Sequence, residues 1–190
     1  MMKLEQLGLS RQAFEYAYQG YNALVQKKKI KPGGNLAICD FSQSSRKKRM
    51  YIVDMSSKEV VMNTYVAHGK KSGGEFATRF SNKPGSHQSS LGFYITNNTY
   101  YGEHGLSLRM TGVEKGINDK ALPRNIVIHG ASYIEESRLK QLGNMGRSFG
   151  CPAVPAKQSK QIINLLSNGH CLFIYHPSKK YLSESKLLND

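Results

Sequence analysis

The feature that most constrains the fold of this chain is a series of short apolar segments, rich in β-branched and aromatic residues, that begins at Leu36. The segments cover residues 36–41, 50–55, 59–67, 91–95, 106–110, 125–129 and 171–175. Basic or serine-rich turns separate the first three, and Ser56–Lys58 has the length of a hairpin connection. Strands and helices do not alternate along the chain. We therefore predict a mainly β fold, an antiparallel sandwich or barrel-like sheet with peripheral helices.

Apolar residues at helical spacing predict three helices, at about 10–29, 135–142 and 157–167. The first has Ser10 as its N-cap and is stopped by Pro32 and two glycines. Glycine, serine, asparagine and proline dominate residues 68–90, which predicts a long loop, and long loops in compact domains are usually functional. The 190 residues fit a single domain, 1–190.

The chain carries a net charge of +14, which favours polyanionic partners such as nucleic acid, anionic membranes or acidic cell-wall polymers. The charge is spread over separate clusters at 27–29, 46–49 and 179–180, and no nucleic-acid-reading motif accompanies them. We therefore expect no nucleic-acid partner. No apolar run approaches the roughly 20 residues of a membrane span. The first residues lack the apolar region of a signal peptide, which fits either a cytosolic protein or an exported one whose leader has been removed.

One of the three cysteines differs from the others in its surroundings. Cys39 and Cys171 lie in apolar runs, where a free thiol packs as a small hydrophobic group. Cys151 instead follows Gly150 and precedes a proline, in the run Gly-Arg-Ser-Phe-Gly-Cys-Pro at 146–152. Upstream, His129 ends an apolar segment. A thiol and an imidazole from separate elements are the minimum set for thiolate catalysis, although a chance loop thiol and a strand-end histidine fit the pattern as well.

Two other chemistries fit the sequence poorly. Residues 146–150 match the G-x-S-x-G elbow of serine hydrolases, but no Asp or Glu lies between Ser148 and His176 to complete a triad in that order. The six histidines and three cysteines show no zinc-binding spacing. We therefore expect no metal ion and no cofactor.

The cysteine interpretation has a physical basis in the neighbouring residues. Gly150 permits close approach of the backbone to a ligand, and the amides of Phe149, Gly150 and Cys151 can converge as an oxyanion hole. His129 at a strand end is held rigidly, and Gly130 leaves room beside its ring. We predict a nucleophile and a base at these positions.

His129-Gly130 followed by Ser148-Phe149-Gly150-Cys151 resembles the signature of the L,D-transpeptidase (YkuD-like) family, a His-Gly pair and then Ser/Thr-x-Gly-Cys. The branch that the chain resembles is that of murein L,D-transpeptidase catalytic domain proteins, and the resemblance extends over about residues 14–188. It also rests on Val-Ala-His-Gly at 66–69, Phe-Ser-Asn-Lys-Pro-Gly at 80–85, Ser-Ser-Leu-Gly-Phe-Tyr at 89–94 and Gly-Leu-Ser-Leu-Arg at 105–109. The family fold, a mostly β domain with the cysteine in a surface groove, agrees with the predicted sheet. Many members have histidine where this chain has Phe149. The difference bears on the shape of the pocket and on which donor strand the pocket accepts.

The resemblance implies a peptidoglycan L,D-transpeptidase. Cys151 would attack the amide between an L-centre and a D-residue of a stem peptide, and a second stem would resolve the acyl-enzyme. His129 would move the proton, with its ring oriented by a backbone carbonyl near Gly130. An L,D-carboxypeptidase or amidase with the same centre, and a non-catalytic basic wall-binding module, are the alternatives.

The resemblance also implies a substrate groove and a location. Arg147 would pair with a stem carboxylate, or equally would brace the loop as a surface arginine. Ser148, His68 and Tyr94 are further candidates for the groove wall. We expect peptidoglycan stem peptides as partners, carbapenem-type inhibitors as ligands, a monomer without a transmembrane segment, and an exported, periplasmic or cell-envelope location.

Overall fold

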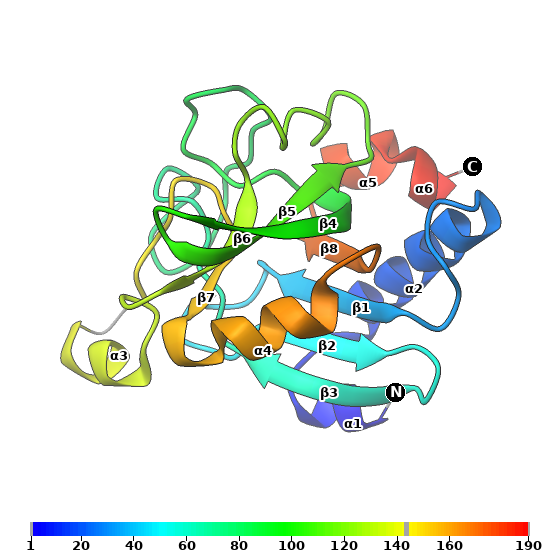
Figure 1. Cartoon of the computed structure of the whole chain (residues 1–190). Helices are drawn as coiled ribbons and strands as arrows, with labels where there is room; N and C mark the ends of the chain where they lie inside the picture. Colours follow the sequence, from blue (N-terminus) through cyan, green and yellow to red (C-terminus); the bar gives the residue numbers. More distant parts are fainter. Residues whose placement is uncertain (1, 143–144, 190) are drawn as a thin grey trace.

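The frame of the protein is one eight-stranded mixed sheet with the strand order β3-β2-β1-β8-β4-β5-β6-β7 (Figure 1). The structure is a computed structural model and describes residues 2–142 and 145–189. The strands are β1 (Asn35–Asp40), β2 (Met50–Asp54), β3 (Glu59–Thr64), β4 (Gly92–Gly102), β5 (Gly105–Gly112), β6 (Val127–Ala131), β7 (Ala153–Pro155) and β8 (Cys171–Tyr175). The helices are α1 (Met2–Gln6), α2 (Arg11–Gln26), α3 (Glu136–Leu142), α4 (Ala156–Leu166), α5 (Lys179–Glu184) and α6 (Lys186–Asn189).

Most neighbouring strands are antiparallel, and the sheet curls so that its two edges approach. β1, β2 and β3 form the predicted meander, and β8, β4, β5 and β6 also pair antiparallel. The pairs β1–β8 and β6–β7 are parallel. Beyond β3, the amide of Ala67 donates to the carbonyl of Ala153 at 2.8 Å, and Gly69 forms a β-bridge with Ser148. The predicted mainly β, barrel-like fold with peripheral helices is confirmed, with a mixed rather than purely antiparallel sheet.

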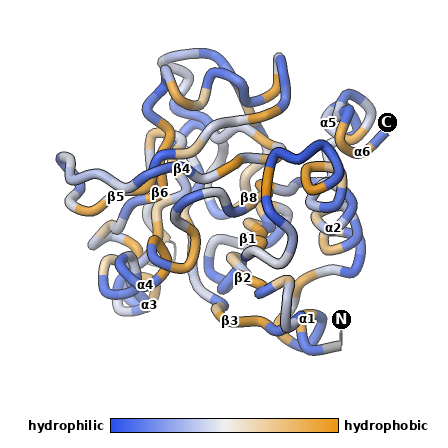
Figure 2. The backbone as a smooth tube through the Cα atoms, turned by 45° about the vertical axis from the view of Figure 1, so that its right-hand side comes forward, coloured by the Kyte–Doolittle hydropathy of each residue, from blue (hydrophilic) through white to orange (hydrophobic). Residues whose placement is uncertain are grey.

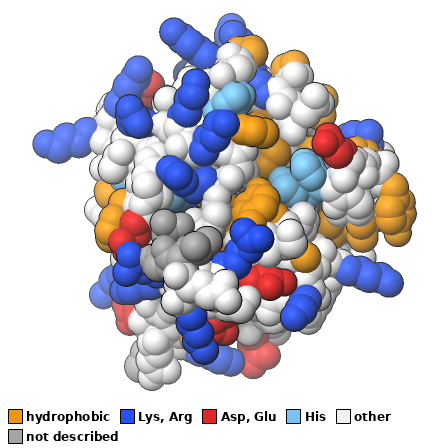
Figure 3. All heavy atoms as spheres, turned by 90° about the vertical axis from the view of Figure 1, so that its left-hand side faces the viewer, with side chains coloured by type: hydrophobic (Ala, Val, Ile, Leu, Met, Phe, Trp, Pro, Cys, Tyr) orange, Lys and Arg blue, Asp and Glu red, His pale blue; other side chains and the backbone are white. Residues whose placement is uncertain are grey.

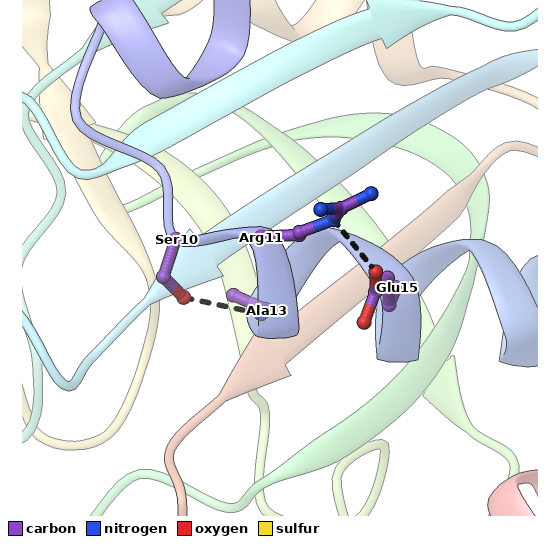
Figure 4. Close-up of polar contacts among 4 residues, drawn as sticks. All are labelled: Ser10, Arg11, Ala13 and Glu15. Atoms are coloured by element: carbon purple, nitrogen blue, oxygen red, sulfur yellow. Dashed lines mark hydrogen bonds and ion pairs between the residues drawn. The ribbon is translucent and has the colours of Figure 1, made fainter. Parts of the chain in front are cut away.

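Helix α2 begins where the sequence predicts it. The hydroxyl of Ser10 accepts a hydrogen bond from the amide of Ala13 at 3.1 Å, which satisfies one of the free donors of the first turn (Figure 4). One turn on, Arg11 and Glu15 form an exposed i,i+4 ion pair at 3.0 Å (Figure 4). Such a pair contributes little in water, so packing of the buried face holds the helix in place.

Two amphipathic helices cover the sheet. α2 packs on β1 and β8, whereas α4 packs on β5, β6, β7 and β1. In Figure 1 α2 lies behind the sheet and α4 in front of it, and hydrophobic and hydrophilic residues alternate along both helices (Figure 2). All five residues of β8 are buried, and Phe173 at its centre stacks on Phe93 of β4 with 4.1 Å between the ring centroids. β8 is therefore covered on both faces, as its unbroken apolar sequence predicts.

The remaining differences from the predicted elements have local causes. β4 runs on to Gly102, beyond the predicted end at Ile95, because its polar second half pairs with β5 in an outward-reaching hairpin. Residues 65–67, predicted as strand, lie outside β3. β7 has only three residues, too few to show a period, and α1, α5 and α6 are likewise short. The predicted loop at 68–90 contains no named strand or helix.

Candidate active site

Cys151 lies on the loop that leads into β7. Its side chain is partly exposed, in contrast to the buried Cys39 and Cys171, and its thiol donates a hydrogen bond to the carbonyl of Asn125 at 3.5 Å. The preceding Gly150 has φ +123°, and a Cβ there would lie 2.8 Å from the carbonyl oxygen of Gln88. Glycine is therefore required at this position both by the backbone conformation and by the space.

Ser148 ties this loop together. Its hydroxyl accepts from the amide of Gly150 at 3.1 Å and donates to the carbonyl of Cys151 at 2.6 Å. The residue is buried, with 5% of its surface exposed. Ser148 therefore positions the nucleophile candidate and does not line an open groove, which corrects its expected role in substrate binding. The amide of Gly150 is occupied as well, so it is not free for an oxyanion.

His129 lies on β6, beside the strand that Cys151 precedes. β6 and β7 run parallel with His129 opposite Ala153, two residues after Cys151. The thiol lies near Val127, whose backbone hydrogen-bonds it. Val127 and His129, two residues apart on β6, point to the same face, roughly 7 Å apart along the strand. The topology thus places the two residues that the sequence singled out on neighbouring elements.

The ring of His129 has a defined orientation. Its Nδ1–H donates to the carbonyl of Gly130 at 3.0 Å, which leaves Nε2 of the neutral ring as an acceptor. On its face, the ring of His104 stacks at 4.2 Å between centroids and 19° between planes. Burial lowers the pKa of His129; the Gly130 carbonyl opposes the shift and the charge of His104 adds to it. The lowered pKa keeps the ring neutral, and chemically able to accept a proton, at neutral pH.

The absence of a side chain at Gly130 serves the packing of α4 and leaves no added room for the histidine ring. A Cβ on Gly130 would lie 2.7 Å from the hydroxyl of Ser159 and 3.2 Å from the Cα of Ala156. The first turn of α4 thus lies directly against β6. This corrects the expectation that Gly130 leaves room beside His129, while its carbonyl has the expected contact with the ring.

Arg124 supports the thiol loop from a third segment and was missed by the sequence analysis. Its guanidinium donates to the carbonyls of Ser81 at 2.9 Å and Gln88 at 2.7 Å, which fastens the long loop beneath Gly150. Burial raises the pKa of the Cys151 thiol, and a backbone hydrogen bond at Val127 and the charge of Arg124 lower it. No motif marks Arg124, because its partners lie more than thirty residues away.

His68 is not a groove residue. It is fully buried: Nδ1 accepts from Nη2 of Arg49 at 2.7 Å and Nε2–H donates to the carbonyl of Gly73 at 3.3 Å. Burial, reinforced by the charge of Arg49, lowers the pKa of His68 to about 4. Its own carbonyl accepts from the amide of Ser148 at 3.0 Å. His68 thus supports the Cys151 loop from inside the protein, which corrects its expected role.

Tyr94 is also misplaced by the sequence prediction. Its ring is fully buried in β4, and its hydroxyl donates to the carbonyl of Ser90 at 2.8 Å. Burial raises the pKa of this hydroxyl. Tyr94 is therefore a core residue that anchors the end of the long loop.

Phe149 and Arg147 are the two exposed members of the predicted set. Phe149 is 63% exposed, its ring lies 4.6 Å from that of His87, and Nζ of Lys70 sits 4.3 Å above it. A shallow pocket borders this ring. Arg147 donates to the carbonyls of Gly73 at 2.9 Å and Lys70 at 3.4 Å, so it braces the loop, the second of its two expected roles.

The face of the molecule in Figure 3 has a distinct character. Histidine side chains are exposed there beside hydrophobic ones, and Lys and Arg side chains gather to the upper left of them. Across residues 2–142 and 145–189, no group of three or more His, Cys, Asp or Glu side chains is placed to hold a metal ion. None of the helices within those ranges is long and apolar enough to cross a membrane.

Together, the fold and the site define a curled β-sheet domain that holds a thiol on the loop before β7 and a neutral imidazole on the adjacent strand β6, an arrangement suited to acyl chemistry. The family model described as L,D-transpeptidase catalytic domain matches residues 5–175. Because this match covers most of the 190 residues, the chain belongs to that family of enzymes.

Several of the solved structures that this chain resembles are L,D-transpeptidases. One is LdtMt1 in complex with imipenem, with a TM-score of 0.46, 12% identity, and coverage of 75% of this chain and 59% of that one. An L,D-transpeptidase from Mycobacterium smegmatis has a TM-score of 0.44, 13% identity, and coverage of 75% and 58%. One from Stackebrandtia nassauensis has a TM-score of 0.44, 11% identity, and coverage of 85% and 66%.

The chain spans less than two thirds of the length of each of these three proteins. At these identities and TM-scores, neither the fold nor any site residue is inferred from the likeness. None of the curated proteins matches the chain.

Proposed function

We propose that this protein is a cysteine-dependent peptidoglycan L,D-transpeptidase with Cys151 as nucleophile. The thiolate sulfur attacks the carbonyl carbon of the amide between an L-centre and a D-residue of a stem peptide. The C–N bond breaks, terminal D-alanine leaves as an amine, and a thioester to Cys151 remains. The amine of a second stem then attacks the thioester, which forms a new amide and returns the thiol. Membership of the family supports this reaction.

The observation that carries the proposal is the placement of a neutral histidine beside the thiol loop. Nδ1 of His129 is held by the Gly130 carbonyl, so Nε2 is the atom that can take the thiol proton. The same nitrogen can then donate this proton to the departing amine. Because burial lowers the pKa of His129 and raises that of Cys151, the resting pair is a neutral imidazole and a neutral thiol, and the proton moves during attack.

The oxyanion that forms during attack requires backbone donors. The amide of Gly150 donates to Ser148, whereas the amides of Phe149 and Cys151 donate no hydrogen bond within the described part of the chain. We assign oxyanion stabilisation to these two amides, with Ser148 and Gly150 fixing the loop that presents them.

The charge around the site suits an anionic substrate. Stem peptides carry carboxylates. Lys70 lies above the exposed ring of Phe149, and Arg147, two residues before Phe149, donates to the carbonyl of Lys70. Arg147 is exposed although two carbonyls hold one of its nitrogens, so its remaining N–H groups can meet a carboxylate. A cell-wall substrate implies an exported, periplasmic or cell-envelope protein.

The direct test is to incubate purified muropeptides with the wild type and with Cys151→Ala. Cross-linked or exchanged stems should form with the wild type and disappear with the variant. Cys171→Ala, which removes a fully buried thiol, is the matched control and should retain activity. Equal product profiles for the wild type and Cys151→Ala contradict the proposal, and binding without turnover in both would indicate a wall-binding module.

Mass spectrometry with a competing D-amino acid then separates transfer from hydrolysis. Exchange of the terminal residue marks a transpeptidase, whereas shortened stems alone mark an L,D-carboxypeptidase or amidase. One neighbouring structure holds imipenem, and we expect a carbapenem to acylate this protein too. The adduct should map to Cys151, and an adduct on another residue contradicts the assignment.

A further inference from the structure

The turn between β4 and β5 brings a second histidine onto His129. Gly102 and Gly105 pair across the hairpin, and His104 lies between them at its tip, exposed to solvent. Its ring nevertheless stacks on the buried ring of His129, 4.2 Å away and within 19° of parallel. An exposed loop side chain normally samples several rotamers. The stacking on His129 instead gives the ring of His104 a defined position.

We propose that His104 is a positioning residue for His129: its ring, together with the Gly130 carbonyl, fixes the plane of the His129 imidazole and closes one face of it to water. The inference rests on the role proposed above for His129 as the proton carrier. It extends that role to a residue outside the motif, 25 positions upstream in the sequence.

Two contacts are needed to define the orientation of an imidazole ring. The hydrogen bond from Nδ1 to the Gly130 carbonyl fixes one edge, but rotation about this bond would still swing Nε2 away from its target. The stacked ring of His104 blocks that rotation, because tilting His129 would drive the two rings into each other. Proton transfer depends steeply on geometry, so holding Nε2 in place favours the reaction.

The electrostatic surroundings of His129 make His104 the group whose charge acts on it. On the neighbouring strands, Ser107 of β5 and Ala153 of β7 face it and carry no charge. α4 approaches β6 through Ser159 at Gly130, and the thiol of Cys151 precedes β7. A protonated His104 disfavours a second proton on His129, and this repulsion contributes to the lowered pKa of His129.

Two substitutions separate the ring from the charge. His104→Phe keeps a flat ring and removes the charge, whereas His104→Ala removes both. Tyr101→Ala, in which an 83% exposed ring on the same hairpin is deleted, is the matched control. For each protein, NMR titration of the His129 ring gives its protonation midpoint, and the stem-peptide assay gives kcat and KM.

We expect His104→Ala to lower kcat about tenfold with little change in KM, the scale expected for a misplaced catalytic group. His104→Phe should retain most of kcat. Both should raise the midpoint of His129, because a positive charge no longer opposes its protonation, and Tyr101→Ala should change neither quantity.

The inference is overturned if His104→Ala leaves kcat and the His129 midpoint unchanged, or if His104→Phe loses as much activity as His104→Ala. The titration does not depend on the substrate. If the wild type fails to turn over stem peptides while the midpoint still shifts in both variants, the proposed function fails and the contact between the two histidines stands.

Discussion

The hydroxyl of Ser148 donates a 2.6 Å hydrogen bond to the carbonyl of Cys151, and this bond closes the loop that holds the thiol. Because the same hydroxyl accepts from the amide of Gly150, one side chain fixes both residues before β7. The backbone that presents Cys151 is thus fixed by a serine that does not itself face the substrate.

Replacing Ser148 by alanine should therefore reduce activity while the protein remains folded. The carbonyl of Cys151 keeps the hydrogen bond from the amide of Ala153 at 2.9 Å. Loss of the hydroxyl therefore leaves only the buried amide of Gly150 unpaired, at a cost of about 1–3 kcal/mol. We expect a folded protein with kcat at least tenfold lower. Ser148→Thr keeps the hydroxyl and should retain activity. Denaturant unfolding and the stem-peptide assay measure the two effects, and full activity in Ser148→Ala would show that the brace is dispensable.

Gly150→Ala should abolish activity. Its φ of +123° is unfavourable for any other residue, and the new Cβ would meet the carbonyl of Gln88 at 2.8 Å. The loop must shift to relieve this contact, which moves Cys151. Gly74→Ala is the control, because a Cβ there meets nothing within 4 Å. Comparison of the alkylation rate of Cys151 in the two variants tests this, and equal rates would contradict it.

Arg124→Gln should make Cys151 less acidic. The positive charge of Arg124 lowers the pKa of the thiol, so its removal raises that pKa and moves the pH midpoint of alkylation upward. Arg124→Lys keeps the charge but loses the forked contacts with the Ser81 and Gln88 carbonyls. Arg124→Lys should therefore keep the wild-type pH midpoint of Cys151 alkylation, although it holds the loop with fewer hydrogen bonds. Arg138→Gln on exposed α3 is the control, and a midpoint that does not move in Arg124→Gln excludes this effect.

The elements that could be predicted from the sequence are those in which the apolar pattern alone decides the structure. β8 is apolar throughout and buried, and β1 is apolar and buried from Leu36 to Cys39. The N-cap at Ser10 is a local signal. The second half of β4 could not be predicted, since polar residues such as Asn98 and Thr99 leave no apolar alternation there. Its strand structure comes from pairing with β5, which is a tertiary effect.

The candidate site divides in the same way. Cys151 and His129 lie in a recognisable motif, whereas His104 and Arg124 reach the site only through the fold, which no local pattern reports. His68 precedes a glycine in a segment that the sequence suggests as a groove wall. In the structure its buried ring instead contacts Arg49, which lies immediately before β2. Residue type alone does not tell on which side of the backbone a side chain lies.

The acid limb of kcat/KM should lie below pH 6.5, the ordinary pKa of histidine. Burial lowers the pKa of His129, so the ring stays neutral and able to accept a proton to a lower pH than a free histidine. Activity should fall only as pH drops through that lowered value. A pH–rate profile measures this, with His129→Gln as the variant that should lack both the limb and most of the activity. A limb above pH 6.5 in the wild type would contradict this prediction.

Stability should fall in mild acid because of His68. Its pKa is about 4 in the folded protein and 6.5 when unperturbed, so between these values the unfolded chain binds a proton that the folded one rejects. The stability contributed by neutral His68 is therefore complete above pH 6.5 and declines as the pH falls toward 4, by up to about 3 kcal/mol. In His68→Gln, the side-chain oxygen can still accept from Arg49 but does not titrate. Urea unfolding across this pH range should give a flatter dependence for the variant, although other buried histidines leave part of the slope. Equal slopes in the two proteins would show that His68 is protonated in the folded state.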